Sequence, residues 1–80
     1  MFYKKVDRHI VYDFISIKAG IKRLNKVNPP ILFVRNKSKN FLGTVTDGDI
    51  RRYILRGENL TDNINTFLCI KALSKLNVNY

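Results

Sequence analysis

Two consecutive prolines, Pro29 and Pro30, divide the first half of the chain into a helical and an extended part. Proline ends a helix, and a residue that precedes a proline is biased towards extended geometry. Before the pair, apolar residues recur at the spacing of one helix face, namely Ile17, Ile21 and Leu24. After it, residues 31–34 are a continuous apolar run of strand length. The pair therefore predicts a helix followed by a strand that is buried on both faces.

The other elements follow from the same kind of pattern. Residues 10–15 are rich in β-branched and aromatic side chains and predict a short strand, and Ser16 is placed to cap the helix after it. Residues 41–45 predict a strand that forms a hairpin with residues 31–34 across the polar turn 36–40. A helix is expected from Asp47 to Arg56, with Gly57 as its C-terminal cap, and a last helix over residues 61–76, with Thr61 or Asp62 near its start.

This order predicts a fold of the α/β (α+β) class. We expect a strand-helix-strand-strand-helix unit with a small three-stranded sheet, helices on one face of that sheet and a C-terminal helix. A chain of 80 residues makes one domain at most, with a thin core, so association between copies is an expected source of stability. The core is expected to include four aromatic side chains, Phe33, Phe41, Tyr53 and Phe67.

The composition limits the setting and the partners of the chain. The single cysteine, Cys69, has apolar neighbours and is expected to be a buried small hydrophobe, which fits a reducing cytoplasm. No stretch has the length of a membrane span or the apolar run of a signal peptide, so we expect a cytoplasmic location and no membrane contact. His9 is expected at the surface, and Asp47 and Asp49 are expected to offset the helix dipole rather than to bind a metal.

The formal net charge of +9 favours anionic partners. The fifteen Lys and Arg residues are spread along the chain, so a solvated basic surface is the favoured interpretation. The sequence offers neither a clustered basic helix nor a recognisable pair of exposed aromatic rings. We therefore expect no nucleic acid as partner, although a basic nucleic-acid-binding protein stays an alternative.

The segment 43–52, Gly-Thr-Val-Thr-Asp-Gly-Asp-Ile-Arg-Arg, lies where a strand ends and a helix begins. The first turn of a helix offers unpaired N–H groups and the positive end of the dipole to a phosphate. The Thr46 hydroxyl can donate to a phosphate oxygen, the Asp49 carboxylate can accept from ribose hydroxyls, and Arg52 can bind phosphate charge. Gly43 lets a backbone or a ligand approach closely. Thr46 and Asp49 also have the spacing of a capping box, and both interpretations stay open.

The pattern Gly-x-hydrophobic-Thr-x-x-Asp-hydrophobic-x-Arg over 43–52, with the elements before it, resembles the signature of the CBS domain. The resemblance covers residues 10–58. It leaves residues 1–9 as an N-terminal extension and residues 59–80 as a C-terminal helix or a linker to a second unit. The form of residues 42–52 is similar to the CBS regions attached to bacterial sugar-phosphate nucleotidyltransferases, and a close variant accompanies sugar-phosphate isomerases of the arabinose-5-phosphate type.

The resemblance implies a regulatory module without catalytic residues. CBS units pair through their sheets and bind adenine nucleotides in the clefts between them, so this single unit is expected to form a homodimer that binds AMP, ADP or ATP. It implies phosphate contacts from Thr46 and Arg52, a ribose contact from Asp49, and a base site that is formed by Ile10, Tyr12 and Phe33. The chain is expected to be the N-terminal piece of a sugar-phosphate nucleotidyltransferase, or to act on a partner enzyme of sugar-nucleotide metabolism. A dimerisation module without ligand is the alternative.

Overall fold

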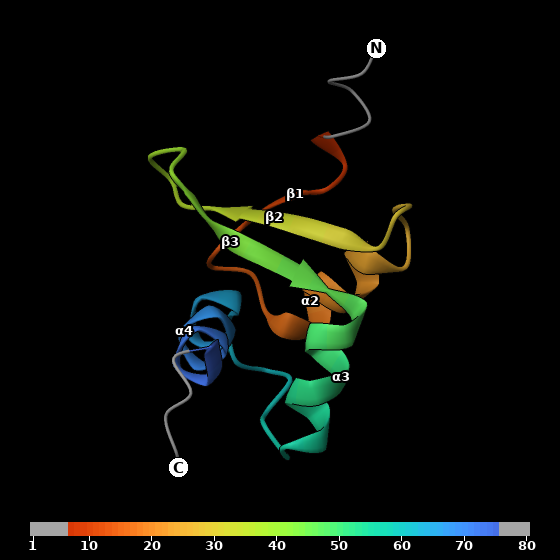
Figure 1. Ribbon diagram of the computed structural model, residues 1–80. Coiled ribbons are helices and arrows are strands. Elements are labelled where there is room, and N and C mark those ends of the chain that lie inside the picture. Colours follow the sequence, from red (N-terminus) through yellow and green to blue (C-terminus); the bar gives the residue numbers. More distant parts are fainter. Residues whose placement is uncertain (1–6, 76–80) are drawn as a thin grey trace.

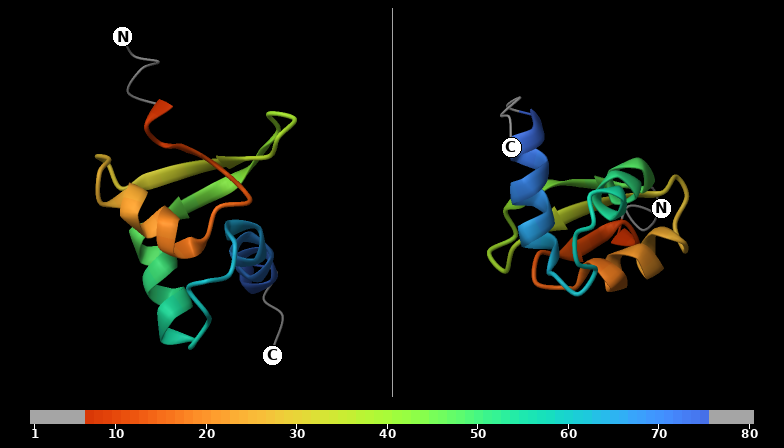
Figure 2. Two further views of the ribbon diagram at one scale, coloured as in Figure 1. Left: turned by 180° about the vertical axis from the view of Figure 1, so that it is seen from behind. Right: turned by 90° about the horizontal axis from the view of Figure 1, so that it is seen from below.

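The computed structural model, in which residues 7–75 are described, is a three-stranded sheet with helices packed against one face (Figure 1). Two further views show the other face of the sheet uncovered by helices (Figure 2). In chain order the elements are β1 (Ile10–Tyr12), α2 (Ile17–Leu24), β2 (Ile31–Arg35), β3 (Phe41–Thr46), α3 (Asp47–Leu55) and α4 (Ile64–Lys75). The predicted fold class is confirmed.

The central strand is β2, which pairs with β1 in parallel and with β3 in antiparallel orientation. A parallel pair needs a crossover connection, and α2 provides it. The antiparallel pair is the predicted hairpin. The side-chain oxygen of Asn36 holds its turn by accepting from the backbone N–H groups of Ser38 and Asn40 at 2.9 and 3.0 Å.

The hydrophobic core lies between the sheet and the helices. Alternate strand residues point into it, and Leu32 and Val34 are 0% exposed. The helices add buried side chains from each of their inward faces, Ile17, Leu24, Ile50, Tyr53, Ile64 and Phe67. The predicted burial of residues 31–34 on both faces is wrong, because no helix covers the second face within the described chain. On this outer face Ile31, Phe33 and Arg35 are half-buried.

The start of α2 is as predicted, with the Ser16 hydroxyl accepting from the Ala19 N–H at 3.1 Å. The helix ends at Leu24, although Val27 beyond it still packs on the core. Gly20 allows α2 to approach α4, since a Cβ at this position would lie 3.1 Å from Cδ1 of Ile64. The absence of a side chain there sets the distance between the two helices.

The strand predicted over residues 10–15 ends at Tyr12 because the following residues bind the start of α4. The carbonyls of Asp13 and Ile15 accept from the N–H groups of Asn65 and Ile64 at 3.1 and 2.9 Å. The helix begins at residue 64 rather than 61, and Asn63 caps it by accepting from the Thr66 N–H at 3.0 Å. Two donors of the first helical turn are therefore bonded across the fold.

Four predicted side-chain positions are wrong, and one of them is Phe33, which lies half-buried on the outer face instead of in the core. His9 is buried, with a side chain that is only 8% exposed. Because β1 pairs with β2, His9 lies beside the start of β2, and its Nδ1 is 2.7 Å from the carbonyl oxygen of Ile31. Cys69 is exposed, because it lies on the opposite side of α4 from Ile64 and Phe67, which face the core. Phe41 is 65% exposed on the edge strand.

Two kinds of feature are absent from the described residues. Within residues 7–75, no helix has both the length and the apolar character needed to cross a membrane. The same part of the chain contains no cluster of three or more side chains able to hold a metal ion.

We expect Ile64→Val to lower the free energy of unfolding by about 1 kcal/mol, because it removes one methylene from a side chain that is 1% exposed. In a domain of this size that change corresponds to roughly 4–8 °C in Tm. Ile54→Val, at a position that is 48% exposed, is the matched control and should change stability by less than about 0.5 kcal/mol. Thermal unfolding followed by circular dichroism measures both. Equal effects would show that α4 does not pack on the core.

Candidate functional site

The capping interpretation of the segment 43–52 is confirmed. The Thr46 hydroxyl accepts from the Asp49 N–H at 3.1 Å, and the Asp49 carboxylate accepts from the Thr46 N–H at 3.1 Å. The two side chains satisfy donors that a helix start leaves unpaired. The arrangement also fixes the Asp49 carboxylate close to the junction of β3 and α3.

The Asp49 carboxylate is bound by two cations as well. Its Oδ1 accepts from Arg52 Nη2 at 2.7 Å, and its Oδ2 accepts from Lys71 Nζ at 2.8 Å. Lys71 also donates to the carbonyl oxygen of Thr44 at 2.7 Å. The ammonium group therefore joins α4 to both β3 and α3. The side chains of Asp49 and Lys71 are only 9% and 19% exposed, so water screens this ion pair weakly.

The pKa of the Asp49 carboxyl is lowered from its ordinary value. Burial alone raises it, but the hydrogen bonds from Lys71 and Thr46, together with the charge of Lys71, outweigh burial. The carboxylate therefore stays ionised and keeps both cations in place at neutral pH.

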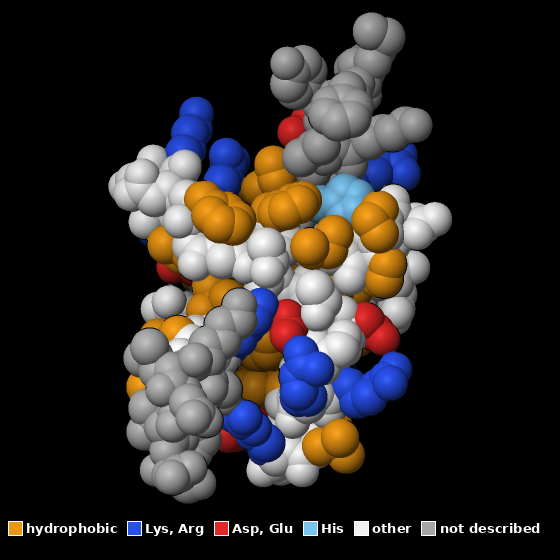
Figure 3. Space-filling view, in the orientation of Figure 1, with side chains coloured by type: hydrophobic (Ala, Val, Ile, Leu, Met, Phe, Trp, Pro, Cys, Tyr) orange, Lys and Arg blue, Asp and Glu red, His pale blue; other side chains and the backbone are white. Residues whose placement is uncertain are grey.

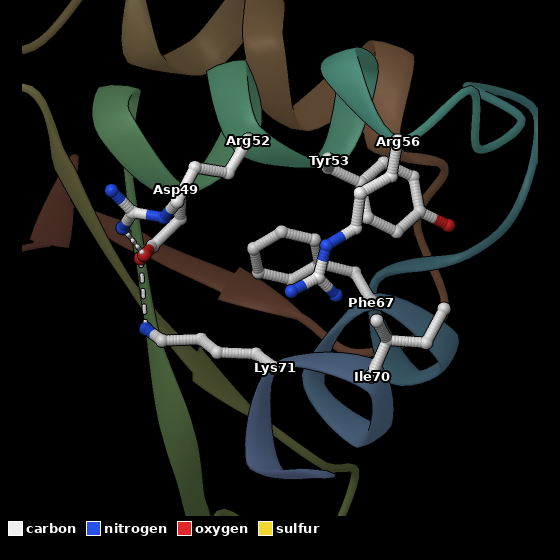
Figure 4. Close-up of a pocket in the computed structure, with 7 residues that line it drawn as sticks. All are labelled: Asp49, Arg52, Tyr53, Arg56, Phe67, Ile70 and Lys71. Atoms are coloured by element: carbon white, nitrogen blue, oxygen red, sulfur yellow. Dashed lines mark hydrogen bonds and ion pairs between the residues drawn. The ribbon is translucent and has the colours of Figure 1, made fainter. Parts of the chain in front are cut away.

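A hollow of about 190 Å³ lies between α3 and α4 beside this carboxylate (Figure 4). Apolar side chains from both helices line it, Tyr53 from α3 and Phe67 and Ile70 from α4. Three cationic side chains also line it, Arg52, Arg56 and Lys71. On the same side of the molecule, Lys and Arg side chains gather below the apolar outer face of the sheet (Figure 3). The hollow can therefore hold an anionic group against an apolar surface.

Tyr53 fixes one wall of the hollow. Its side chain is buried, and its hydroxyl donates to the Asp62 carboxylate at 3.0 Å. Burial and this interaction with Asp62 raise the pKa of Tyr53 to about 12. The hydrogen bond to Asp62 attaches the segment between α3 and α4 to α3. The Tyr53 ring packs edge-on against the ring of Phe67, with the two ring centroids 5.2 Å apart.

The seven residues that were predicted to bind a nucleotide fall into three groups. Asp49 and Arg52 line the hollow, and Thr46 caps the helix that carries them. Gly43 lies against α4, where an added Cβ would be 3.1 Å from Cδ2 of Leu68. The other three belong to the strands β1 and β2, namely Ile10, Tyr12 and Phe33.

Five residues around the hollow were not predicted as ligand contacts, namely Tyr53, Arg56, Phe67, Ile70 and Lys71. Lys71 lies 22 positions after Asp49, and no spacing rule relates residues so far apart. The only signal was the apolar face of the last helix, which indicated packing rather than a site.

Comparisons with protein-family models, with curated proteins and with solved structures give no match to this chain. The assignment to the CBS class therefore stays a prediction from the residues 10–58 themselves.

The ion pair between Asp49 and Lys71 should contribute measurably to stability. In a double-mutant cycle of Asp49→Asn and Lys71→Met, we expect a coupling energy of about 1 kcal/mol or more, since both groups are largely buried. The matched control is the pair of Asp47 and Arg51, whose side chains are 63% and 73% exposed; its coupling should stay below about 0.5 kcal/mol. Urea unfolding measures both cycles. Equal coupling energies for the two pairs would show that Lys71 and Asp49 do not form a buried ion pair.

The raised pKa of Tyr53 predicts a loss of stability at alkaline pH. The unfolded chain releases this proton near pH 10, whereas the folded chain keeps it until about pH 12. The free energy of unfolding should therefore fall between these values, by up to about 1.4 kcal/mol per pH unit from this group. Tyr53→Phe should reduce that slope relative to the parent chain in urea unfolding between pH 9 and 11. If Tyr53→Phe left the dependence of stability on pH unchanged, the pKa of Tyr53 would not be raised by burial of its hydroxyl.

Proposed function

We propose that the chain is a regulatory module that binds an adenine nucleotide, with a phosphate group in the hollow between α3 and α4. The observation that carries the proposal is the convergence of cationic side chains from two helices on one apolar-lined hollow. Arg52 and Arg56 come from the α3 end of it, and Lys71 comes from α4. A phosphate group with two negative charges would, together with the Asp49 carboxylate, balance these three positive charges and accept several charge-assisted hydrogen bonds.

Asp49 supports a ribose contact in the same place. A carboxylate offers about four lone-pair sites, and here three are taken, by Thr46, Arg52 and Lys71. If Arg52 turned from Asp49 to a phosphate, Oδ1 would become free to accept from a ribose hydroxyl. The Arg52 side chain is 68% exposed, so such a rotation needs no repacking of the core.

The size of the hollow restricts the position of the base. Pockets that enclose a drug-sized ligand have at least about 300 Å³, so a volume of about 190 Å³ encloses the phosphate and part of the sugar only. A neighbouring groove between β3 and α4 also includes Lys71 and has apolar walls from Leu42 and Leu68. We propose this groove for the base, because β1 lies at the opposite edge of the sheet, with β2 between.

The regulatory part of the proposal rests on α4. A ligand that binds residues of α3 and α4 together would favour the state in which α4 is seated, and a partner that contacts α4 would detect that shift. Homodimer formation and the link to a sugar-phosphate nucleotidyltransferase remain predictions from the resemblance, and the cytoplasmic location remains a prediction from the composition. The outer face of the sheet is the surface that such a pairing would use.

The test is isothermal titration of the purified chain with AMP, ADP, ATP, adenosine and inorganic phosphate. We expect AMP to bind more tightly than either adenosine or phosphate alone, because each fragment lacks one part of the site. Arg52→Ala should weaken AMP binding about tenfold, since it removes a charge-assisted hydrogen bond. The same ligands should raise Tm, because they bind the folded state only.

Arg51→Ala is the matched control. It removes a neighbouring arginine of α3 that also pairs with an aspartate of the first turn, and Arg51 does not line the hollow. Its affinity for AMP should stay within about twofold of the parent chain, a difference below about 0.5 kcal/mol. No heat or Tm shift with millimolar nucleotide, or an equal loss in both variants, would refute the nucleotide site.

A further inference from the structure

A cluster of aromatic and cationic side chains lies at the end of the sheet where β1 and β2 finish. It consists of Tyr12, Phe14, Arg35 and Lys37, and we call it the aromatic cluster. The rings of Tyr12 and Phe14 are stacked, with centroids 5.1 Å apart and planes 14° apart. The Arg35 guanidinium carbon lies 5.0 Å from the Tyr12 centroid, and Lys37 Nζ lies 6.0 Å from the Phe14 centroid.

The topology assembles this cluster from separate parts of the chain. Because β1 and β2 are parallel, Tyr12 and Arg35 are register partners at the end of their strands. Arg35 Nη2 also donates to the Tyr12 hydroxyl at 3.0 Å. Lys37 comes from the hairpin turn, and Phe14 follows β1. A pair of exposed aromatic rings, which cannot be recognised in the sequence alone, is present in the structure.

Core packing does not account for the aromatic cluster. The side chains of Tyr12 and Phe14 are 37% and 56% exposed. The Arg35 Nε is buried and finds no hydrogen-bond partner among the described residues, which is an unfavourable state for a charged group. A guanidinium group that turned towards an anionic ligand would gain the missing bond.

Further aromatic side chains lie next to the aromatic cluster on the outer face of the sheet. Phe41 is the register partner of Arg35 and is 65% exposed, and its ring lies 6.5 Å from that of Phe33. Figure 3 shows apolar side chains over the sheet and cationic ones at the β2–β3 turn. Aromatic rings on an open sheet, next to cations in a chain of net charge +9, are complementary to bases and phosphates.

We propose that the aromatic cluster binds single-stranded nucleic acid. Lys37 would turn from the Phe14 ring to a backbone phosphate, and one base would take its place on that ring. Another base would stack on Phe41, and Arg35 would contact a second phosphate. Stacking on these rings requires unpaired bases, since a duplex hides the faces of its bases. The cluster lies at the Phe41 end of β3, and the hollow beside Asp49 lies at the Thr46 end. This proposal therefore does not depend on the nucleotide site.

The test is fluorescence anisotropy of a labelled 12-nucleotide oligothymidylate with the full chain at 50 and 200 mM NaCl. We expect binding that weakens with salt, as release of counterions requires, and preference for the single strand over a duplex of equal length. Phe14→Ala should weaken binding about tenfold by removing a stacking surface. Lys37→Ala should weaken it about threefold and lower the slope of log affinity against log salt by about 0.7.

Two matched controls separate this site from general basicity. Leu55→Ala removes a side chain that is 79% exposed on α3, and Lys22→Ala removes one charge from the exposed side of α2. Both should leave affinity within about twofold, a difference below about 0.5 kcal/mol. Equal losses in the controls and the cluster variants, or equal binding of single strand and duplex, would overturn the proposal. So would a homodimer that Phe14→Ala abolishes, because the cluster would then be a protein interface.

Discussion

The contact between Lys71 and Asp49 connects the parts of this fold that the sheet alone does not hold together. A three-stranded sheet with two helices leaves α4 attached only by its own packing and by the hydrogen bonds at its start. The Lys71 ammonium, bonded to Asp49 and to the Thr44 carbonyl, fixes the far part of α4 to β3 and α3. Asp49 can accept this bond because the capping box with Thr46 already orients its carboxylate. Local capping and long-range attachment therefore share one side chain.

The same contact determines what the hollow can bind. Without α4, Arg52 and Arg56 would lie on a helix surface with no apolar wall and no further cation beside them. With α4 seated, Phe67 and Ile70 supply an apolar surface beside them, and Lys71 adds a further cation. A phosphate bound here would contact groups from both helices, which makes the hollow sensitive to the position of α4. This coupling is the physical basis of the regulatory role that we propose.

The helices cover one face of the sheet, and this leaves the outer face for other uses. The core side chains of β2 alternate with Ile31, Phe33 and Arg35, which the described chain does not bury fully. The nucleic-acid proposal and a homodimer would both use this face, but at different places. The aromatic cluster occupies the end where β1 and β2 finish, whereas pairing through the sheets would use the middle of the strands.

The sequence by itself determined the local elements and the capping of two helices. The periodicity of residues 17–24, the Ser16 cap, the Thr46 and Asp49 capping box and the Gly57 stop all depend on neighbours within a few positions, and all are confirmed. The proline pair separates α2 from β2 as predicted, but α2 already ends at Leu24, and β2 is not buried on both faces. Only the folded chain shows the burial of His9, the exposure of Cys69 and Phe41, the early end of β1, the attachment of Lys71 and the contact of Arg35 with Tyr12. Each of these depends on a partner brought near by strand pairing or helix docking. Such partners are set by the packing of the whole chain, which sequence spacing does not encode.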